Sequence, residues 1–412
     1  MPPMTNNQKQ SIEKELEPRR KRSVFWEALL NKWLSRIEAG ELRAVFPSSF
    51  QKVYSGGQVG PTADIQINSW KLVPRLLLSG DMGLAESFLS GEWETSNLTQ
   101  LILLGDINER ALGNAVNPSK FINLIEKLRH KRRDNSKRGS RRNIAAHYDL
   151  GNEFYSHWLD NSMSYSSALF KDFGEKLEVG QNRKYQRLAK ALKLKEGDQV
   201  LEIGCGWGGF AQIAAKEYKC NVVGITLSNE QAKFAQRRMQ ETQLTNLVDI
   251  RIEDYRDVQG SFDKIVSIEM FEAVGEEHWR NYFETIKTHL KPGGLAGIQS
   301  ITIANEFFDT YKRRPDFIQK YIFPGGILPS EDKLNNAVSS AGLKILDDYY
   351  FGKSYAETLR RWQSTFEQKW GDIKNLGFDE KFQKMWRYYL SYCEAGFETG
   401  HINVGQFLIG SK

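Results

Sequence analysis

The chain has 412 residues, of which 40% are hydrophobic and 26% are charged, an ordinary composition for globular domains. Its three cysteines show no C-x-x-C spacing and no nearby pair of histidines, which argues against a disulfide framework and a zinc site, so we expect no bound metal. Apolar runs such as Leu72 to Leu78 are much shorter than the roughly 18 residues of a membrane span, and the polar start lacks the apolar core of a secretory signal. We therefore expect a cytoplasmic protein of two to three domains.

The first part of the chain predicts a tail and a small domain. Residues 1–22 are polar and charged, which is typical of a disordered segment. Residues 23–128 predict a helical and α+β domain. In it, apolar residues at helical spacing begin near Phe25, an alternating strand pattern covers Ala63 to Ile67, and an amphipathic helix covers Asn97 to Ile107.

A basic linker, residues 129–142, follows this domain. It contains eight Lys or Arg residues and a single acid, Asp134, and so holds much of the excess behind the net charge of +6. One interpretation is a solvated linker, because blocks of like charge are commonly disordered. Another is a patch attracted to anionic phospholipid headgroups, at about 1 kcal/mol per basic residue. Nucleic acid is disfavoured as a partner because no aromatic side chains alternate with the charges.

Residues 143–412 alternate strand and helix patterns, which predicts an α/β fold with a doubly wound, mostly parallel sheet. The predicted strands are 199–203, 221–225, 248–252, 263–268, 294–301, 343–350 and 404–409. A mostly helical stretch rich in aromatic residues, from Tyr355 to about Glu398, separates the last two strands. Segments 143–190 and 302–330 interrupt the alternation, as a substrate cover at the carboxyl end of the sheet would.

The turn after the first of these strands predicts a nucleotide site. Glycine-rich residues Gly204 to Gly209 lead from the strand into a helix, so the backbone can lie against an adenosyl group. A dinucleotide site would place an acid at the end of the next strand, but Thr226, Leu227 and Ser228 stand there. Neutral side chains with one acid, Glu202, suit S-adenosylmethionine, although an acid before a helix also serves as a cap.

Several motifs resemble those of cyclopropane-fatty-acyl-phospholipid synthases, a family shared with the mycolic acid cyclopropane synthases. The matching runs, in family order over residues 143–412, are 146–155, 163–168, the glycine loop, 223–228, 267–275, 322–330 and 355–359. The run Phe323 to Ser330 is the most specific. A weaker similarity, at Gly80 to Phe88, extends to the N-terminal domain, which we therefore interpret as lipid-associated. The resemblance implies a Rossmann-like class I methyltransferase fold with seven strands.

The family's activity supplies the expected function. The resemblance implies transfer of a methylene group from S-adenosylmethionine to the cis double bond of an unsaturated phospholipid acyl chain, which forms a cyclopropane ring. It also implies a bound bicarbonate as the base. Such a protein is expected on the cytoplasmic side of the membrane, peripherally associated with its anionic surface. The oligomeric state stays open, a homodimer included.

The resemblance also implies the site residues. Glu272 matches the acid that fixes bicarbonate, and Tyr355 matches the tyrosine that donates a hydrogen bond to it. Ser167 replaces the usual cysteine, whose backbone amide holds the ion, and Gln299 replaces the usual histidine, so the amide can donate a hydrogen bond but cannot exchange a proton. These four are the predicted catalytic residues. The predicted cofactor site comprises Tyr165, Ser166, Glu202, Gly204, Cys205, Gly206, Thr226, Leu227, Gln231 and Tyr255.

Three other functions compete with this one. A methyltransferase acting on nucleic acid or protein is disfavoured because the fourth strand ends in Glu269 to Glu272 and lacks an Asn-Pro-Pro-Tyr type of motif. A fatty-acyl methyltransferase of the same family, whose product is a methyl or methylene branch, stays open, and Ser167 and Gln299 lie where that choice could be made. A lipid-binding protein without activity is disfavoured by the intact Glu272, Tyr355 and glycine loop.

Overall fold

The computed structural model describes residues 23–113 and 150–411. Packing divides the chain into two compact units, Met1–Leu124 and Ile125–Lys412. The predicted tail, residues 1–22, and the basic linker, residues 129–142, lie outside the described residues. None of the helices within the described ranges is both long and apolar enough to cross a bilayer.

The first unit is a small α+β structure. Residues 23–34 form a helix, and the sheet has the order β2-β1-β3-β4, in which β1 and β3 are parallel and the other neighbours are antiparallel. Its elements are β1 (Ala39–Val45), β2 (Gln51–Ser55), β3 (Gln58–Ile67), α2 (Leu72–Leu89), β4 (Trp93–Glu94), α3 (Leu98–Ile107) and α4 (Glu109–Gly113). The predicted strand lies in β3, and the predicted helix is α3, whose N-cap Asn97 accepts a hydrogen bond from the Gln100 N–H. Both predictions are confirmed.

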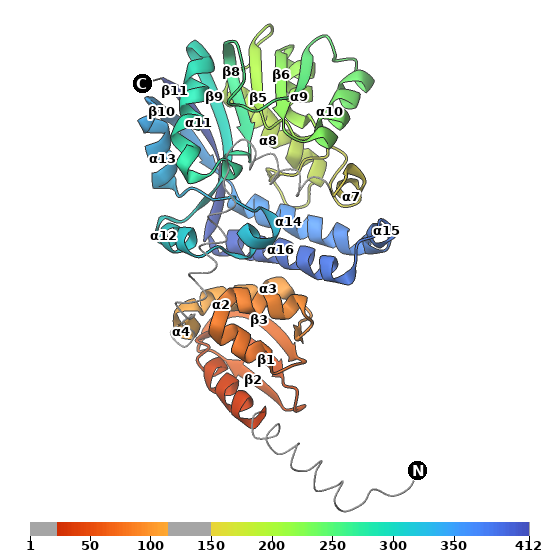
Figure 1. The fold of residues 1–412 in the computed structure, drawn as a ribbon, viewed down its shortest axis with the longest axis vertical. Coiled ribbons are helices and arrows are strands. Elements are labelled where there is room, and N and C mark those ends of the chain that lie inside the picture. The colour runs from red at the N-terminus through yellow and green to blue at the C-terminus, as the bar shows by residue number, and fades with distance from the viewer. Residues whose placement is uncertain (1–22, 114–149, 412) are drawn as a thin grey trace, which may run out of the picture. The chain divides into compact units, whose positions relative to one another are not determined.

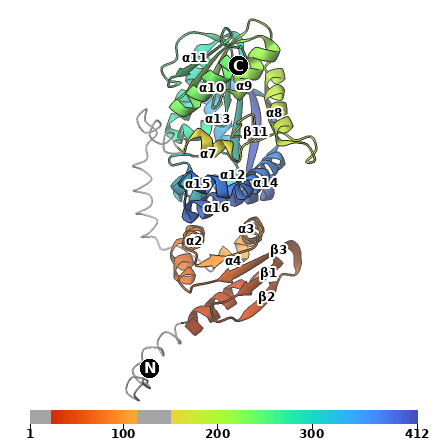
Figure 2. The same ribbon diagram turned by 90° about the vertical axis from the view of Figure 1, so that its right-hand side faces the viewer.

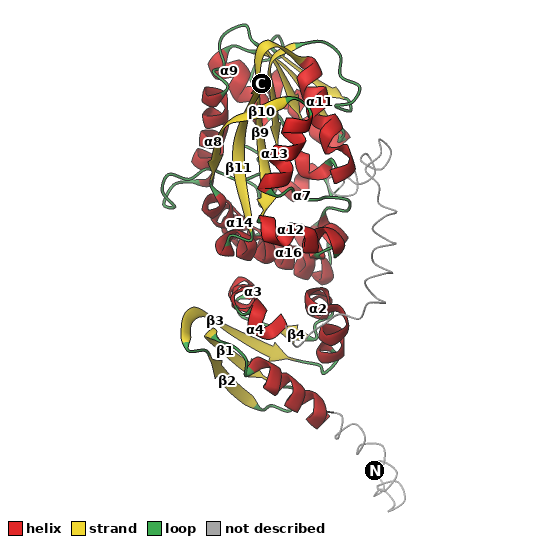
Figure 3. Cartoon of the chain, turned by 90° about the vertical axis from the view of Figure 1, so that its left-hand side faces the viewer, coloured by secondary structure: helices red, strands yellow, loops and turns green. Residues whose placement is uncertain are grey.

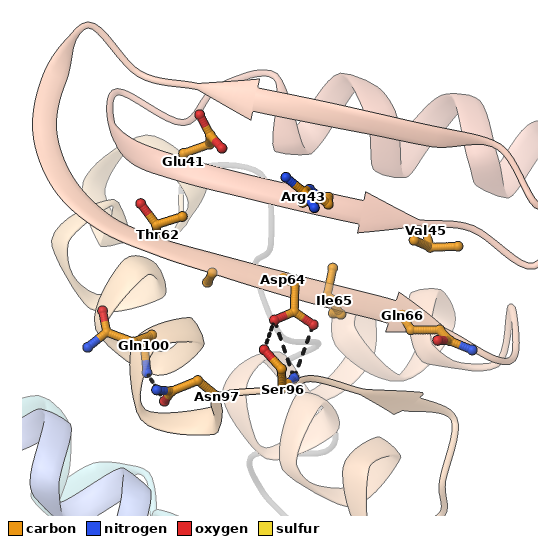
Figure 4. A pocket seen from close by; sticks show the side chains of 11 residues that line it. Glu41, Arg43, Val45, Thr62, Asp64, Ile65, Gln66, Ser96, Asn97 and Gln100 are labelled. Carbon is orange, nitrogen blue, oxygen red and sulfur yellow. Dashed lines mark hydrogen bonds between the residues drawn. The ribbon is translucent and has the colours of Figure 1, made fainter.

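A hollow of about 540 Å³ lies on this unit, along β1 and β3 (Figure 4). Its lining is mostly polar, and the Asp64 carboxylate in it accepts a hydrogen bond from the Ser96 backbone N–H at 3.0 Å. It contains none of the predicted site residues.

The second unit contains a seven-stranded sheet of order β10-β11-β9-β8-β5-β6-β7. Its strands are β5 (Gln199–Ile203), β6 (Asn221–Thr226), β7 (Val248–Ile252), β8 (Phe262–Ile268), β9 (Leu290–Ile303), β10 (Leu343–Tyr350) and β11 (Ile402–Ser411). The neighbours from β9 to β7 are parallel, and β11 is antiparallel to both β9 and β10. All seven predicted strands are confirmed, as is the doubly wound, mostly parallel fold.

Helices cover both faces of this sheet (Figure 1). They are α8 (Leu177–Ala191), α9 (Gly209–Tyr218) and α10 (Asn229–Glu241) on one face and α11 (Trp279–His289) and α13 (Glu331–Ser340) on the other. Successive residues of β5 explain this arrangement. Val200 packs with the apolar side chains of α8, α9 and α10, and Leu201 packs with those of α11 and α13. Side chains of a strand alternate between faces, so a strand with apolar side chains on both faces needs helices on both sides.

A third group of helices gathers at one end of the sheet (Figures 1 and 2). It comprises α7 (Asn152–Ser156), α12 (Asn305–Arg313), α14 (Gly352–Gln368), α15 (Trp370–Asn375) and α16 (Glu380–Thr399). The long strands β9 and β11 extend to this end (Figure 3). These helices come from the segments that interrupt the strand and helix alternation, and from the predicted helical stretch before β11. They therefore surround the sheet end at which a ligand of this fold binds.

Candidate active site

The glycine loop joins β5 to α9 in the predicted way. Gly204, Gly206 and Gly208 all have positive φ, at 80°, 53° and 81°. The backbone N–H groups of Gly204 and Cys205 both donate to the Ile225 carbonyl on β6, which holds the loop against the neighbouring strand. A Cβ added to Gly206 would meet no atom within 4 Å, so the backbone there is open to a ligand. This arrangement fits the adenosyl group of S-adenosylmethionine.

Glu202 and Cys205 are both buried beside this loop. The Glu202 carboxylate accepts a hydrogen bond from the Ala211 N–H in the first turn of α9, and burial raises its pKa well above the usual range. That contact is the capping role that an acid before a helix serves. A part in cofactor binding stays a prediction for both residues.

Three further predicted cofactor residues lie at or after the end of β6, namely Thr226, Leu227 and Gln231. The Thr226 hydroxyl donates to the Gln231 side-chain oxygen at 2.9 Å, which leaves the Gln231 N–H groups directed elsewhere. Ser228 caps α10 by accepting the Gln231 backbone N–H, and Leu227 between them is half-buried. The side chains of Thr226 and Gln231 thus stand together at the carboxyl end of β6.

Tyr255 follows β7, next in order along the same sheet edge. Its ring packs against Tyr282 with ring centres 5.3 Å apart, and burial raises its pKa to about 12. Since β5, β6 and β7 are parallel neighbours, the predicted cofactor residues after them lie along one edge of the sheet.

The segment Ser164–Phe170 is fixed between α8 and α14. The Gln181 side chain of α8 donates to the Ser166 carbonyl at 2.9 Å, and the Ala168 N–H donates to the Thr358 hydroxyl of α14 at 3.1 Å. Tyr165 donates or accepts a hydrogen bond with the Tyr389 hydroxyl at 2.8 Å. These contacts present the Ser167 N–H to the end of β8.

The acid that receives this N–H is Glu269, the residue directly after β8. Its Oε1 accepts from the Ser167 N–H at 2.9 Å and from the Gln299 side-chain N–H at 2.7 Å. Its Oε2 accepts from the Tyr355 hydroxyl at 2.6 Å. Three of the four predicted catalytic residues therefore meet on one carboxylate that had no predicted role.

Two successive hydrogen bonds between polar side chains fix the orientation of the Gln299 amide. The Arg187 guanidinium donates to the Gln406 oxygen at 2.9 Å, and the Gln406 amide donates to the Gln299 oxygen at 3.0 Å. With its oxygen engaged, Gln299 can present only N–H groups to Glu269. The sequence alone did not show this relay, because Gln406 is more than a hundred residues away.

Lys184 is the second functional candidate that the sequence analysis missed. The residue is fully buried, its ammonium donates to the Ser166 hydroxyl, and Glu269 is its strongest charged neighbour. Burial lowers the pKa of Lys184 to about 7, while the nearby Glu269 charge opposes that shift. The cationic form of Lys184 therefore stabilises the Glu269 carboxylate.

Glu272 lies one turn further on, in the short helix η1 (Phe271–Ala273). Its Oε1 accepts from the Ser300 hydroxyl at 3.0 Å and from the Ile301 N–H at 2.5 Å, and its buried Oε2 has no partner among the described residues. Burial, together with the charge of Glu269, raises the pKa of Glu272 to about 8. The Tyr355 hydroxyl donates to Glu269 and not to Glu272, whose predicted catalytic role stays a prediction.

An aromatic cluster borders these polar groups. Its members come from α7, α14, α16 and the loops between, and are Tyr155, Trp158, Tyr165, Phe323, Trp362, Trp386 and Tyr389. Tyr165 is central, with ring centres 5.4 Å from Trp362 and 5.5 Å from Trp158. Tyr355 touches the same cluster through Trp362. Such a surface suits an apolar chain and excludes water.

The predicted bicarbonate does not fit this arrangement. The Tyr355 hydroxyl, the Ser167 N–H and the Gln299 amide, which the resemblance assigns to the ion, all donate to Glu269 instead. A further anion would also lie beside a second carboxyl, Glu272, whose pKa Glu269 already raises. The prediction of bound bicarbonate is therefore not supported.

Comparisons with known proteins show the family of this chain. Residues 135–407 match the family model described as mycolic acid cyclopropane synthetase. The chain is 37% identical to a tuberculostearic acid methyltransferase of Mycobacterium tuberculosis, over 87% of this chain and 86% of that protein. It is 36% identical to the cyclopropane-fatty-acyl-phospholipid synthase of Escherichia coli K12, over 84% of this chain and 87% of that protein.

A solved structure extends the comparison to three dimensions. The crystal structure of the mycolic acid cyclopropane synthase CmaA1 with SAH and CTAB is 30% identical and superposes with a TM-score of 0.62. It covers 65% of this chain and 97% of that chain. The methyltransferase fold and an S-adenosylmethionine cofactor are thus common to this chain and its relatives.

Proposed function

The chain belongs to the mycolic acid cyclopropane synthetase family and is an S-adenosylmethionine-dependent methyltransferase, and from this premise we propose that it alkylates the cis double bond of an unsaturated acyl chain in a phospholipid, forming a cyclopropane ring. The observation that carries the proposal is the junction of the glycine loop with the Glu269 cluster. Strands β5 and β8 are parallel neighbours, and a Cβ built on Gly204 would lie 2.8 Å from the Met270 side chain, next to Glu269.

Different residues bind the cofactor and the acyl chain. Gly204, Gly206, Thr226 and Gln231 hold S-adenosylmethionine, which supplies an electrophilic methyl group on a positively charged sulfur. The aromatic cluster holds the acyl chain and keeps water from the cation that an alkylated alkene becomes. Aligning the double bond with the methyl group is the main contribution, because an alkene is a poor nucleophile.

Two features support the lipid as substrate. The E. coli relative is named for a fatty-acyl phospholipid, and its similarity covers both units of this chain. The excess of basic residues in the linker would draw the protein to an anionic membrane surface, where its substrate lies. We propose peripheral association with that surface.

A branch-forming methyltransferase is the second candidate. It is favoured by the 37% identity to a tuberculostearic acid methyltransferase and by the departures at Ser167 and Gln299. Both candidates share the first alkylation, and both lose a proton of the transferred methyl group. They differ in where the positive charge lies when that proton leaves. For the ring, the electrons of the broken C–H bond join the methyl carbon to the cationic carbon. For a methylene branch, a 1,2-hydride shift first moves the charge to the carbon that bears the methyl group, and the C–H electrons then form the double bond of the methylene group.

The test is product analysis with the purified full chain. Vesicles of a cis-monounsaturated phosphatidylglycerol are incubated with the protein and S-adenosylmethionine. The acyl chains are then released from the lipid, separated by gas chromatography and identified by mass spectrometry. A ring product gains one CH₂ and resists ozonolysis, whereas a methylene-branched product gains the same mass and is cleaved. No mass gain in the acyl chains, with S-adenosylmethionine bound, would contradict the proposal.

A further inference from the structure

The Glu269 carboxylate has the hydrogen-bonding partners that the family resemblance assigns to a separate anion. From this we propose that Glu269 is the proton acceptor of the reaction, a built-in base that replaces bicarbonate in this chain. The inference rests on the proposed function, since it concerns the proton lost after alkylation. The inference about Glu269 can be tested separately from the proposed function, because anion binding can be measured without turnover.

The backbone places Glu269 where a base would be needed. It is the first residue after β8, and its N–H donates to the Gln299 carbonyl on β9 at 2.8 Å. Its φ is +49°, a left-handed conformation that is uncommon outside glycine and that occurs often at functional sites. The next residue, Met270, packs on the cofactor loop at Gly204. The carboxyl group therefore lies between the cofactor loop and the aromatic cluster.

The surroundings favour an ionised carboxylate. All three hydrogen-bonding groups on Glu269 are donors, and the Gln406 contact prevents Gln299 from presenting its oxygen. Burial raises the pKa of Glu269, while the Lys184 charge and the donors limit that rise. A carboxylate that is ionised and yet more basic than usual is suited to accept a proton.

The electron and proton balance of the step is simple. The alkene π electrons form a bond to the methyl carbon as the carbon–sulfur bond breaks, with its electron pair left on sulfur as a neutral thioether. A C–H bond of the transferred methyl group then breaks, its electrons close the third side of the ring, and the proton goes to Glu269. A carboxylate has about four lone-pair positions, and three are used, with one of them on Oε2. Oε2 therefore has room for the proton.

The first experiment uses the purified full chain and the phosphatidylglycerol vesicles in buffer freed of carbon dioxide. We expect release of S-adenosylhomocysteine to stay within twofold when bicarbonate is added at constant pH and ionic strength. Glu269→Gln keeps the size of the side chain, and its amide oxygen can still accept from Ser167 and Gln299, while the Tyr355 hydroxyl must turn to accept from the amide N–H. Because an amide is a far weaker base, turnover should fall about 10²-fold or more, with the S-adenosylmethionine Kd within threefold of the parent. The matched control is Glu277→Gln, an exposed glutamate near the same strand end, which should keep turnover within twofold.

The second experiment removes the Glu269 side chain. Glu269→Gly suits the left-handed backbone and frees the three donors, so bicarbonate or formate should restore part of the lost turnover. Bicarbonate should also raise the melting temperature of Glu269→Gly relative to matched chloride, and leave that of the parent unchanged. The melting temperature can be measured without turnover, so it tests the inference even if the protein does not alkylate the lipid.

Three results would overturn the inference. They are a more than fivefold stimulation of the parent by bicarbonate, an equal rise in the melting temperature of parent and Glu269→Gly, and turnover of Glu269→Gln within threefold of the parent. If Glu269→Gly does not fold, the inference is tested by the bicarbonate response of the parent and by the turnover of Glu269→Gln.

Discussion

Tyr355 is the residue whose hydroxyl fixes the free end of the Glu269 carboxylate, at 2.6 Å. A hydrogen bond to a charged group contributes about 1.5–3 kcal/mol. Tyr355→Phe removes that bond and keeps the ring contacts with Phe397 and Trp362. We expect turnover to fall about 10- to 100-fold with the S-adenosylmethionine Kd unchanged, measured by product release and calorimetry.

The control for that variant is Tyr218→Phe, at the end of α9, whose hydroxyl has no hydrogen bond among the described residues. Its turnover should equal that of the parent. A Tyr355→Phe protein with parental turnover would show that the hydroxyl contributes only to packing.

Glu272 gives the site a pH dependence. Burial and the neighbouring Glu269 raise its pKa to about 8, whereas an unfolded glutamate titrates near pH 4.3. The folded protein therefore binds more protons between these values, so the stability from this group is complete below about pH 4 and is lost as the pH rises through 8. We expect the melting temperature to fall more steeply from pH 6 to 9 in the parent than in Glu272→Gln.

The comparison between the two proteins isolates this group. Lys184, whose pKa is lowered to about 7, changes stability in the opposite direction above that pH, but it does so in both proteins. Glu277→Gln should follow the parental curve, since its side chain is exposed. Parallel melting curves for parent and Glu272→Gln would show that Glu272 is not buried in the way described.

The residue-level predictions named three residues that the structure brings together, but not the carboxylate that they contact. Ser167, Gln299 and Tyr355 do converge, although they are widely separated in the chain. Glu269 was missed because a motif does not show which of two acids, three residues apart, faces the shared donors. Its place directly after a buried strand was the available signal. Lys184 could not be found, because nothing in a helical pattern marks a lysine that is fully buried.

At the scale of elements, α14 positions the loop that carries Ser167. The Thr358 hydroxyl accepts the Ala168 N–H and donates to the Ser354 carbonyl, and the residue is fully buried. Thr358→Val has the same shape but leaves a buried N–H without a partner, at a cost of about 1–3 kcal/mol. We expect a lower melting temperature and a turnover reduced about tenfold, because the Ser167 N–H is less well placed.

Thr365→Val is the matched control on the same helix. Its hydroxyl donates only to the Arg361 carbonyl within α14, and the residue is half-buried. Both variants are compared by calorimetry and product release. If Thr365→Val and Thr358→Val behave alike, the effect belongs to the helix and not to the loop.

The elements themselves were largely predictable. Strands 199–203, 248–252 and 343–350 match the structure residue for residue, because apolar runs bounded by turns define buried strands well. β9 extends further than predicted, from Leu290, through a Pro-Gly-Gly turn that a pattern does not include in a strand. The parallel pairing of β1 with β3 depends on contacts between segments, which local patterns do not contain.

At the scale of the whole molecule, the comparisons separate the two units. CmaA1 is covered almost completely, yet it corresponds to only 65% of this chain, whereas the tuberculostearic acid methyltransferase and the E. coli synthase extend over more than 80% of it. The catalytic fold therefore occurs without the first unit. The basic linker, residues 129–142, lies outside the described residues, so its role stays a prediction from the sequence.

That linker carries the final prediction, that it governs access to membrane lipid and not chemistry. Changing Arg132, Arg133, Lys137 and Arg138 to Gln removes four of its eight positive charges. Charges near a surface act over roughly 10 Å at 0.1 M salt, so the parent should bind anionic vesicles less well as salt rises, and the variant should bind them weakly at any salt concentration. Its S-adenosylmethionine Kd should be parental, because no cofactor motif includes these positions.

The control removes the same charge elsewhere. Changing Lys216, Lys219, Lys233 and Arg237 to Gln lowers the net charge equally, on exposed positions of α9 and α10 and the turn after α9. Sedimentation with phosphatidylglycerol and phosphatidylcholine vesicles compares the three proteins. We expect the control to sediment with the anionic vesicles almost as the parent does, since the attraction is local to the linker. Equal sedimentation of the linker variant and the parent would show that the segment has no part in membrane binding.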